Sequence, residues 1–540
     1  MGGGLMQLVA YGAQDIYLTG NPQITFWKVS YKRHTNFSME SIEQTFNGAA
    51  DWGRKVTCTI SRNGDLIYRV YLQATLPRVT VSGAQQFRWL NWIGHVMIQN
   101  VDVEIGGQRI DRHYGDWLHI WNELSQSAGH ATGYASMVGN LPRLVQPISG
   151  TTNQAVAAPN NQFLTASQMA FGDCDLTSCM PETTLYIPLE FWFCRNPGLA
   201  LPLIALQYHE VKINLQFQSA SNCYWYNANG GGASFTLPSL KAASLYVDYV
   251  YLDTDERRRF AQTSHEYLIE QLQFTGAESV NSSSNKIKLN FNHPVKELIW
   301  VVQPDSNVSI NDTQLYGGPQ WFNYTDAMDT TPLTGTPQDP YGGGLTGSGL
   351  LQGAGSMTSS LFANVGTIGG GNIQIVDQAT GFSNSASPTD PVVLNSNLNG
   401  NGAIANNANA ALSTAWNMGL NSGNYLLDRG NNPVAYAKIQ LNGHDRFSER
   451  EGRYFNLVQP YQAHTNCPAI GINVYSFGLK PEEHQPSGTC NMSRIDNATL
   501  QLQLTARAVA SARSCQVRVY ATNYNVLRIM SGMGGLAYSN

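Results

Sequence analysis

The second half of this chain repeats four features of the first half in the same order. Both halves contain a glycine-bearing hairpin turn followed by a glycine and an aromatic residue, and then three strand-like segments. The paired segments are residues 105–117 and 441–454, 185–195 and 470–480, 211–217 and 500–504, and 245–252 and 517–524. Features that recur in one order indicate a duplicated domain. Since 540 residues are enough for two domains, any fold proposed for one half must also suit the other.

Each half is predicted to be an antiparallel β-sandwich. Apolar and polar residues alternate over short segments, as in strands that bury one face. In the first half the segments are 55–60, 66–76, 92–99, 101–105, 184–193, 210–217 and 244–252. Residues 116–123 predict a short helix and residues 125–183 a long loop region. The pattern gives tandem β-sandwiches, and an eight-stranded jelly roll suits each half because its two Greek keys protect the sheet edges.

The predicted organisation has four parts. Residues 1–34 form an N-terminal arm, residues 35–255 the first roll and residues 256–540 the second roll. Residues 305–433 interrupt the second roll as a large insertion. A helix over residues 253–262, capped by Asp253 or Thr254, is predicted to join the two rolls.

One strand near the C-terminus is apolar on both faces. Ile472 and Val474 point to one side, whereas Tyr475, Phe477 and Leu479 point to the other. A strand of this kind is covered on both faces or changes partner along its length. We therefore predict that these five side chains make contacts beyond their own sheet, with another subunit.

Two segments carry a family resemblance. YSFGLKPEEHQPSGTCNMSRID, at residues 475–496, resembles the C-terminal signature of the major capsid proteins of nucleocytoplasmic large DNA viruses, of the iridovirus, phycodnavirus and mimivirus type. LMQLVAYGAQDIYLTGNPQITFWK, at residues 5–28, resembles their N-terminal signature. The resemblance implies an all-β double jelly roll and a homotrimeric, pseudo-hexameric capsomer that tiles an icosahedral shell over an inner viral membrane. It also implies neighbouring capsomers and minor capsid proteins as partners, a place in the virion, and assembly in the host cytoplasm.

Two segments are assigned to opposite faces of such a shell. Residues 303–437 hold eight Asp and one Arg, with no Lys, Glu, His or Cys, and so carry a net charge of −7. We predict that residues 305–433 form an acidic outer cap, which could meet a host surface. The resemblance places the arm on the inner face, where its apolar side chains would find the docking surface that they need. These side chains are Leu5, Met6, Leu8, Val9, Phe26 and Trp27.

The sequence contains no recognisable catalytic constellation. Glu482, Glu483 and His484 are adjacent in a loop and so are not expected to converge on one point. A cupin-like enzyme would cluster its histidines, whereas the eleven here are scattered. We expect no enzymatic activity and no cofactor. A lectin-like, glycan-binding double sandwich is the alternative function.

Metal and nucleic-acid binding are also not expected. Cys174 and Cys179 have a spacing that could serve a metal, but no second pair lies nearby, and we expect free thiols. The run of arginines at residues 257–259 suits a solvated helix face. Outside residues 303–437 the chain holds 31 basic and 29 acidic residues, too balanced for direct contact with nucleic acid.

Overall fold

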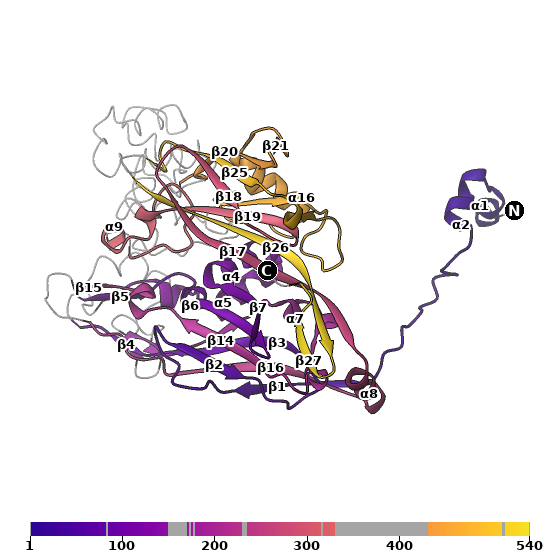
Figure 1. Cartoon of the computed structure of the whole chain (residues 1–540), viewed down its shortest axis with the longest axis horizontal. Helices are drawn as coiled ribbons and strands as arrows, with labels where there is room; N and C mark the ends of the chain where they lie inside the picture. The colour runs from indigo at the N-terminus through magenta and orange to yellow at the C-terminus, as the bar shows by residue number, and fades with distance from the viewer. Residues whose placement is uncertain are drawn as a thin grey trace, which may run out of the picture.

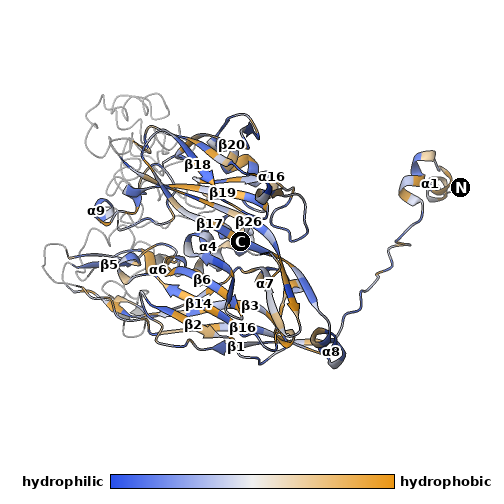
Figure 2. Ribbon diagram, in the orientation of Figure 1, coloured by the Kyte–Doolittle hydropathy of each residue, from blue (hydrophilic) through white to orange (hydrophobic). Residues whose placement is uncertain are grey.

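The computed structural model describes residues 2–82, 85–149, 170–171, 174–175, 179–228, 235–314, 317–329, 430–509 and 513–538 (Figure 1). It contains two β-sandwiches, one built from each half of the chain. The four main sheets lie roughly in series in Figure 1, from the sheet containing β1 at the bottom to the sheet containing β20 at the top. Hydrophobic and hydrophilic residues alternate along many of the strands (Figure 2).

The first roll consists of two sheets with the strand orders β1-β16-β3-β12 and β2-β14-β6-β7. In chain order its strands are β1 (Phe37–Gln44), β2 (Lys55–Thr59), β3 (Leu66–Leu76), β6 (Ile98–Ile105), β7 (Gln108–Tyr114), β12 (Thr183–Pro188), β14 (Val211–Phe217) and β16 (Ala242–Leu252). Numbered one to eight within the roll, they pair as 1-8-3-6 and 2-7-4-5. This order is that of a jelly roll.

The second roll has the orders β17-β26-β19-β23 and β18-β25-β20-β21, which again read 1-8-3-6 and 2-7-4-5. Its strands are β17 (His265–Val280), β18 (Ser284–Leu289), β19 (Pro294–Pro304), β20 (Val434–Leu441), β21 (His444–Asp445), β23 (Ile472–Ser476), β25 (Ala498–Leu504) and β26 (Cys515–Met530), with β22 (Arg450–Glu451) also paired to β20. The predicted duplication and fold class are therefore confirmed: the chain is a double jelly roll.

Local chemistry explains why the hairpin features recur. In each roll the fourth and fifth strands are joined by two residues with positive φ, Gly106 and Gly107 in one and Asn442 and Gly443 in the other. This is the turn that matches the twist of antiparallel strands. A glycine then follows the fifth strand, because a Cβ on Gly115 would lie 2.2 Å from the His95 carbonyl oxygen. A Cβ on Gly452 would lie 2.0 Å from the Val434 carbonyl oxygen, so the same close crossing is present in both rolls.

Helices lie at the ends of the rolls and between them. They are α3 (Ile93–Val96), α4 (Gly115–Ser125), α5 (Ala128–Val138), α6 (Pro142–Val145), α7 (Trp192–Arg195), α9 (Ile310–Thr313), α16 (Gln459–Ala463) and the π-helical turn η9 (Tyr454–Val458). The predicted helix at 116–123 is confirmed as α4. The strand predicted at 92–99 is wrong over its first part, because Trp92 has a left-handed backbone and α3 follows it. The predicted loop region at 125–183 contains α5 and α6, and the strand predicted at 184–193 ends in α7.

The predicted linker helix is α8 (Thr254–Gln262). The Asp253 carboxylate caps it by accepting a hydrogen bond from the Thr254 N–H at 2.8 Å. The Arg257 guanidinium lies 3.0 Å from the Asp65 carboxylate of the first roll. None of its residues is buried, so α8 is a solvated helix at the junction of the two rolls.

Short strands complete the described part of the chain. They are β4 (Val79–Thr80), β5 (Gln86–Trp89), β8 (Ile148–Ser149), β9 (Ala170–Phe171), β10 (Cys174–Asp175), β11 (Cys179–Met180), β13 (Leu201–Pro202), β15 (Tyr224–Asn227), β24 (Cys490–Asn491) and β27 (Met533–Leu536). The N-terminal arm carries α1 (Gly3–Val9) and α2 (Ile16–Thr19), which lie away from the rolls in Figure 1. No helix in the described ranges is long and apolar enough to span a membrane.

The described flanks of the insertion are part of the folded body. Tyr324 is buried between the two rolls, and the buried Arg88 donates a hydrogen bond to the Gly317 carbonyl at 2.9 Å. Asp326 and Asn431 are hydrogen-bonded to each other, which brings the two flanks together. The predicted outer cap over 305–433 is therefore wrong at its ends, because these ends fill space between packed elements. Its central part, residues 330–429, lies outside the described residues.

Candidate functional site

The strand that is apolar on both faces lies between the two rolls of the same chain. Ile472 and Val474 on β23 are fully buried in a cluster that includes α4 of the first roll. Tyr475 faces the core of the second roll, and Phe477 packs partly against that core. Side chains of Ile472, Val474 and Tyr475 are thus unavailable for the predicted contact with another subunit, because the chain itself covers both faces. Only Leu479 is exposed, at 79%.

Helix α4 connects the rolls because side chains on one of its sides pack into the first roll and side chains on another side pack against the second roll. Leu118 enters the core of the first roll. Ile120, Trp121 and Leu124 pack against the sheet β17-β26-β19-β23 of the second roll. The sheet contributes Ile299 and Val301 of β19 and Tyr520 of β26 to this contact. We call this contact the roll interface. Burial of each large apolar side chain contributes roughly 1.5–3 kcal/mol, so the two rolls are held together as one unit.

Charged and aromatic groups border the roll interface. The Arg518 guanidinium lies 3.2 Å from the Asp116 carboxylate, which also accepts a hydrogen bond from the Tyr520 hydroxyl. The Trp117 ring lies 5.5 Å from the Tyr520 ring. Arg195 of α7 stacks over Trp121 at 4.7 Å. The contacts of Asp116 and Trp117 with Arg518 and Tyr520 join the two rolls and help to fix the orientation of α4 on the sheet of the second roll, whereas Arg195 and Trp121 both belong to the first roll.

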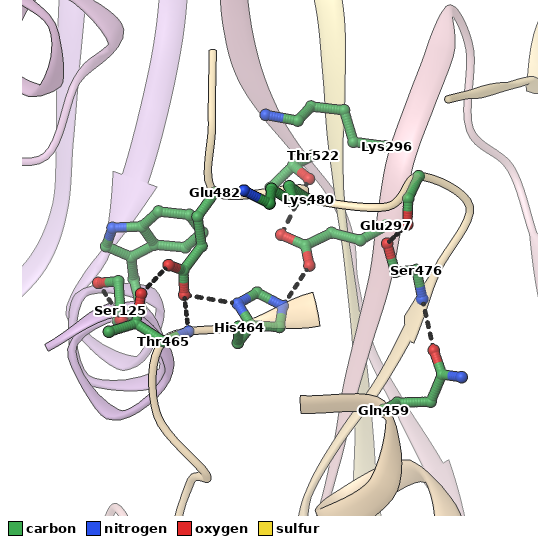
Figure 3. A network of polar contacts seen from close by, with 12 residues as sticks. Ser125, Lys296, Glu297, Gln459, His464, Thr465, Ser476, Lys480, Glu482 and Thr522 are labelled. Atoms are coloured by element: carbon green, nitrogen blue, oxygen red, sulfur yellow. Dashed lines mark hydrogen bonds and ion pairs between the residues drawn. The ribbon is translucent and has the colours of Figure 1, made fainter. Parts of the chain in front are cut away.

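A buried histidine holds the loop that follows β23 (Figure 3). The His464 ring lies between two carboxylates, with Nε2 2.7 Å from Glu297 and Nδ1 2.9 Å from Glu482. Thr465 donates its backbone N–H to Glu482 at 3.0 Å, and its hydroxyl also donates to that carboxylate. Thr522 donates to Glu297 at 3.3 Å. We call these five residues the His464 cluster.

The electrostatics of the His464 cluster favour the charged forms of His464 and Glu482. Burial opposes protonation of His464, but Glu297 and Glu482 outweigh it and raise the pKa of the ring to about 9. Burial also opposes ionisation of Glu482, yet hydrogen bonds from His464 and Thr465 lower the pKa of that carboxyl. At neutral pH the histidine is therefore a cation that joins strand β19 to the loop after β23.

A second cluster, which we call the Glu270 cluster, links the same loop to the first roll. The Glu270 carboxylate lies 2.7 Å from Lys296 and 3.1 Å from Arg195, and the His484 ring lies 3.4 Å away. Burial opposes ionisation of Glu270, but Arg195, His484 and Lys296 lower the pKa of this carboxyl to about 2. Lys296 also donates to the backbone carbonyl of Glu483 at 3.2 Å.

These contacts give the Glu482–Glu483–His484 segment a structural role. Glu482 binds His464, Glu483 binds the exposed Lys480 at 2.9 Å, and His484 faces Glu270. The three side chains point to different partners, so they do not form a shared acid–base or metal-binding centre. In the described ranges no group of three or more His, Cys, Asp and Glu side chains could hold a metal ion.

Sequence reasoning missed His464, Glu297, Glu270, Lys296 and Arg195. One signal was available, because Lys296 and Glu297 are charged residues within the mostly apolar strand β19, and buried charges need partners. Nothing in the sequence indicates which partners those are. His464 is 167 residues from Glu297 and 18 from Glu482, and only the folded chain brings the three groups together.

The remaining predicted residues have separate locations. The six predicted side chains of the arm are all exposed in the described structure: Leu5, Met6, Leu8, Val9, Phe26 and Trp27. Cys179 is disulfide-bonded, so the expectation of a free thiol is wrong at that position. The side chain of Cys174 lies outside the described residues. Burial raises the pKa of the Cys58 thiol to about 11, which makes this free cysteine unreactive.

Comparison with known proteins covers the whole chain. Residues 25–253 match the family described as major capsid protein N-terminus, and residues 256–535 match the large eukaryotic DNA virus major capsid protein family. The chain is 57% identical to the major capsid protein of Phaeocystis pouchetii virus and 39% identical to that of Paramecium bursaria Chlorella virus 1, with all of both chains covered in each case.

Solved structures show the same fold. The quasi-atomic model of the PBCV-1 virus capsid matches 96% of this chain and 100% of its own, with a TM-score of 0.61 and 33% identity. The Faustovirus major capsid protein, at 13% identity and a TM-score of 0.60, supports the fold alone. The double jelly roll, the interface that joins its two rolls and the matches along its whole length lead to one conclusion. The chain belongs to the family of major capsid proteins of large eukaryotic DNA viruses and is a structural component of a viral capsid.

Proposed function

We propose that this chain forms a homotrimeric, pseudo-hexameric capsomer and that these capsomers tile the facets of an icosahedral shell. The observation that carries the proposal is the roll interface, since it joins two rolls of one topology into a single block. Three such blocks around a threefold axis present six similar domains, an arrangement that can pack against neighbours with near-sixfold symmetry. The shell would be assembled in the host cytoplasm around an inner viral membrane.

The mass in solution tests the trimer. Light scattering coupled to size-exclusion chromatography should give three times the 59.2 kDa of one chain at micromolar concentration. An obligate interface of the size expected for such a block buries more than roughly 2,000 Å² and would survive this dilution. A monodisperse monomer would contradict the proposal. A trimer that shows no hexagonal blocks by negative-stain microscopy would contradict the pseudo-hexameric form.

The N-terminal arm is proposed to lie on the inner face of the shell, close to minor capsid proteins and the inner membrane. Its exposed side chains support this role, because apolar groups on a terminus need a covering surface. Residues 2–25 contribute no buried side chain to the rolls. Deleting residues 1–25 should therefore leave the melting temperature and the trimeric state unchanged while abolishing shell assembly. Loss of folding in the deleted protein would instead make the arm part of the core.

The central part of the insertion is proposed to form the outer surface of the capsomer, where contact with a host is also proposed. Asp326 and Asn431 are hydrogen-bonded, so a short linker can join the ends. Replacing residues 330–429 with a Gly/Ser linker should leave the protein trimeric and its melting temperature nearly unchanged, since the free energy of loop closure depends weakly on length. Replacing 305–433 should lower the melting temperature, because it removes Tyr324 from the roll interface. An equal fall in melting temperature in both variants would contradict an outer location for residues 330–429.

No enzymatic activity, metal, cofactor or direct contact with nucleic acid is proposed for this chain. The Glu482–Glu483–His484 segment is engaged in structural contacts, and the Arg257 side chain is paired with Asp65. The lectin-like alternative is not favoured, because the family matches run from residue 25 to residue 535 and account for both rolls.

A further inference from the structure

Each side of the roll interface has a copy elsewhere in the chain. The copy of its helix is in the second roll, and the copy of its sheet is in the first roll. Within the chain, the helix that follows the fifth strand of the first roll packs on the outer face of the 1-8-3-6 sheet of the second roll. Because the chain is duplicated, it also has a helix after the fifth strand of the second roll and a 1-8-3-6 sheet in the first roll. Among the residues that the structure describes, neither of these elements has the partner that its copy has.

The two helical segments correspond residue by residue when Gly115 is placed on Gly452. Leu118 then matches Phe455, and each is buried in the core of its own roll. The residues of α4 that bury the roll interface are Ile120, Trp121 and Leu124, at 0%, 5% and 0% exposure. Their counterparts are Leu457, Val458 and Tyr461, at 47%, 40% and 81% exposure. The apolar pattern has thus been kept on a helical segment whose apolar side chains are exposed in the described part of the chain.

The matching sheet of the first roll presents tyrosines on its outer face. Tyr71 of β3 stacks on Tyr246 of β16 with ring centroids 5.4 Å apart, and Tyr186 of β12 lies 6.3 Å from Tyr71. Tyr186 is exposed, and Tyr71 and Tyr246 are half-buried. We call these three residues the tyrosine face. The sheet that bears it lies at the lower end of the body in Figure 1, whereas α16 lies in its upper part.

The second-roll helical segment and the first-roll sheet also carry opposite charges, with the signs exchanged relative to the roll interface, although Arg453 lies 3.8 Å from Glu451 within the chain. In the roll interface the helix supplies Asp116 and the sheet supplies Arg518. At the counterpart, the helical segment supplies Arg453, which corresponds to Asp116 and is exposed. The sheet supplies Glu43, an exposed residue that accepts a hydrogen bond from Tyr246 at 3.5 Å.

We propose that Leu457, Val458 and Tyr461 of one copy of this chain pack on the tyrosine face of a second copy, with Arg453 opposite Glu43. This inference rests on the proposed trimer and specifies which faces meet within it. The contact joins the end of one chain to the beginning of the next, so it is head-to-tail and closes into a ring. In the trimer, three such contacts alternate with three roll interfaces and give six equivalent helix-on-sheet contacts.

Two surface variants test the proposed faces. The helix variant carries Leu457→Asp and Tyr461→Asp, and the sheet variant carries Tyr186→Asp and Tyr246→Asp. Each places carboxylates in an apolar contact and should shift the midpoint of trimer formation to at least about a hundredfold higher concentration. Leu479→Asp is the matched control, because it changes an exposed leucine outside both faces and should leave the trimer intact. Circular dichroism melting curves check that all three variants are folded.

Mixing the two variants shows whether the contact is head-to-tail. The helix variant keeps a working tyrosine face and the sheet variant keeps a working helix, so an equimolar mixture should form a dimer through one intact contact. A folded helix variant that stays trimeric, or a mixture that stays monomeric while each variant alone is folded, would overturn the proposed faces. If the aspartates prevent folding, Leu457→Ala with Tyr461→Ala replaces the helix variant, Tyr186→Ala with Tyr246→Ala replaces the sheet variant, and each should still weaken the trimer. A wild-type monomer would instead overturn the trimer itself.

Discussion

Replacing Ile472 with alanine will lower the free energy of unfolding by about 2–5 kcal/mol. Ile472 is fully buried and packs in the cluster that holds α4 of the first roll against β19 and β23 of the second. Truncation removes three carbon atoms and leaves a cavity between α4 and the sheet of the second roll, which close packing prevents from closing fully. Because the cavity lies between the rolls, both rolls should melt earlier, and the transition should broaden if the rolls begin to unfold separately.

Chemical denaturation at a fixed protein concentration measures this effect. The matched control is Leu479→Ala, on the same segment but exposed at 79%, which should change the free energy by less than about 0.5 kcal/mol. The comparison separates two roles for this segment. If Ile472→Ala leaves stability unchanged but dissociates the trimer, then its side chain serves a subunit contact and the packing between rolls is not what stabilises the chain.

Replacing Glu297 with glutamine will destabilise the protein by about 3 kcal/mol at pH 6, because it leaves a buried imidazolium with one carboxylate instead of two. Both the His464 and Glu297 side chains are fully buried, so solvent cannot take the place of the lost charge. The loop carrying Glu482 is joined to β19 through this histidine. We therefore also expect faster amide hydrogen exchange in residues 480–488.

The pH dependence of stability shows whether the charge on His464 accounts for the destabilisation caused by Glu297→Gln. The pKa of His464 is raised in the folded state to about 9, so its stabilising contribution is complete below the unfolded value of about 6.5 and is lost as the pH rises to about 9. The difference between wild type and Glu297→Gln should accordingly be larger at pH 6 than at pH 9.5. Glu123, whose pKa burial raises to about 7, is present in both proteins, and its contribution largely cancels in the comparison.

The control for this prediction is Glu266→Gln. Glu266 forms an ion pair with Arg528 at 2.8 Å, and both side chains are more than half exposed. Exposed pairs contribute little, so this change should be nearly neutral at either pH. A Glu297→Gln effect that is the same at pH 6 and pH 9.5 would mean that packing, and not the charge on His464, accounts for the loss.

Much of the fold was predictable from this sequence, because duplication and strand alternation are local signals. The hairpin at Gly106 and Gly107 and its copy at Asn442 and Gly443 need positive φ, and the glycine after each fifth strand is required by a close backbone crossing. The alternation of apolar and polar residues identified strands such as β3 and β14, because one face of each strand packs in a hydrophobic core. It failed at α3, where a single helical turn is too short for any period to appear.

Tertiary structure decided where the apolar and charged residues of the site go. The sequence shows that β23 is apolar on both faces, but the choice between another subunit and the same chain depends on the approach of α4 from more than 300 residues away. It likewise shows Lys296 and Glu297 inside an apolar strand, whereas their partners Glu270 and His464 come from separate elements. Such pairings follow from the relative placement of two sheets, a long-range property that local periodicity does not encode.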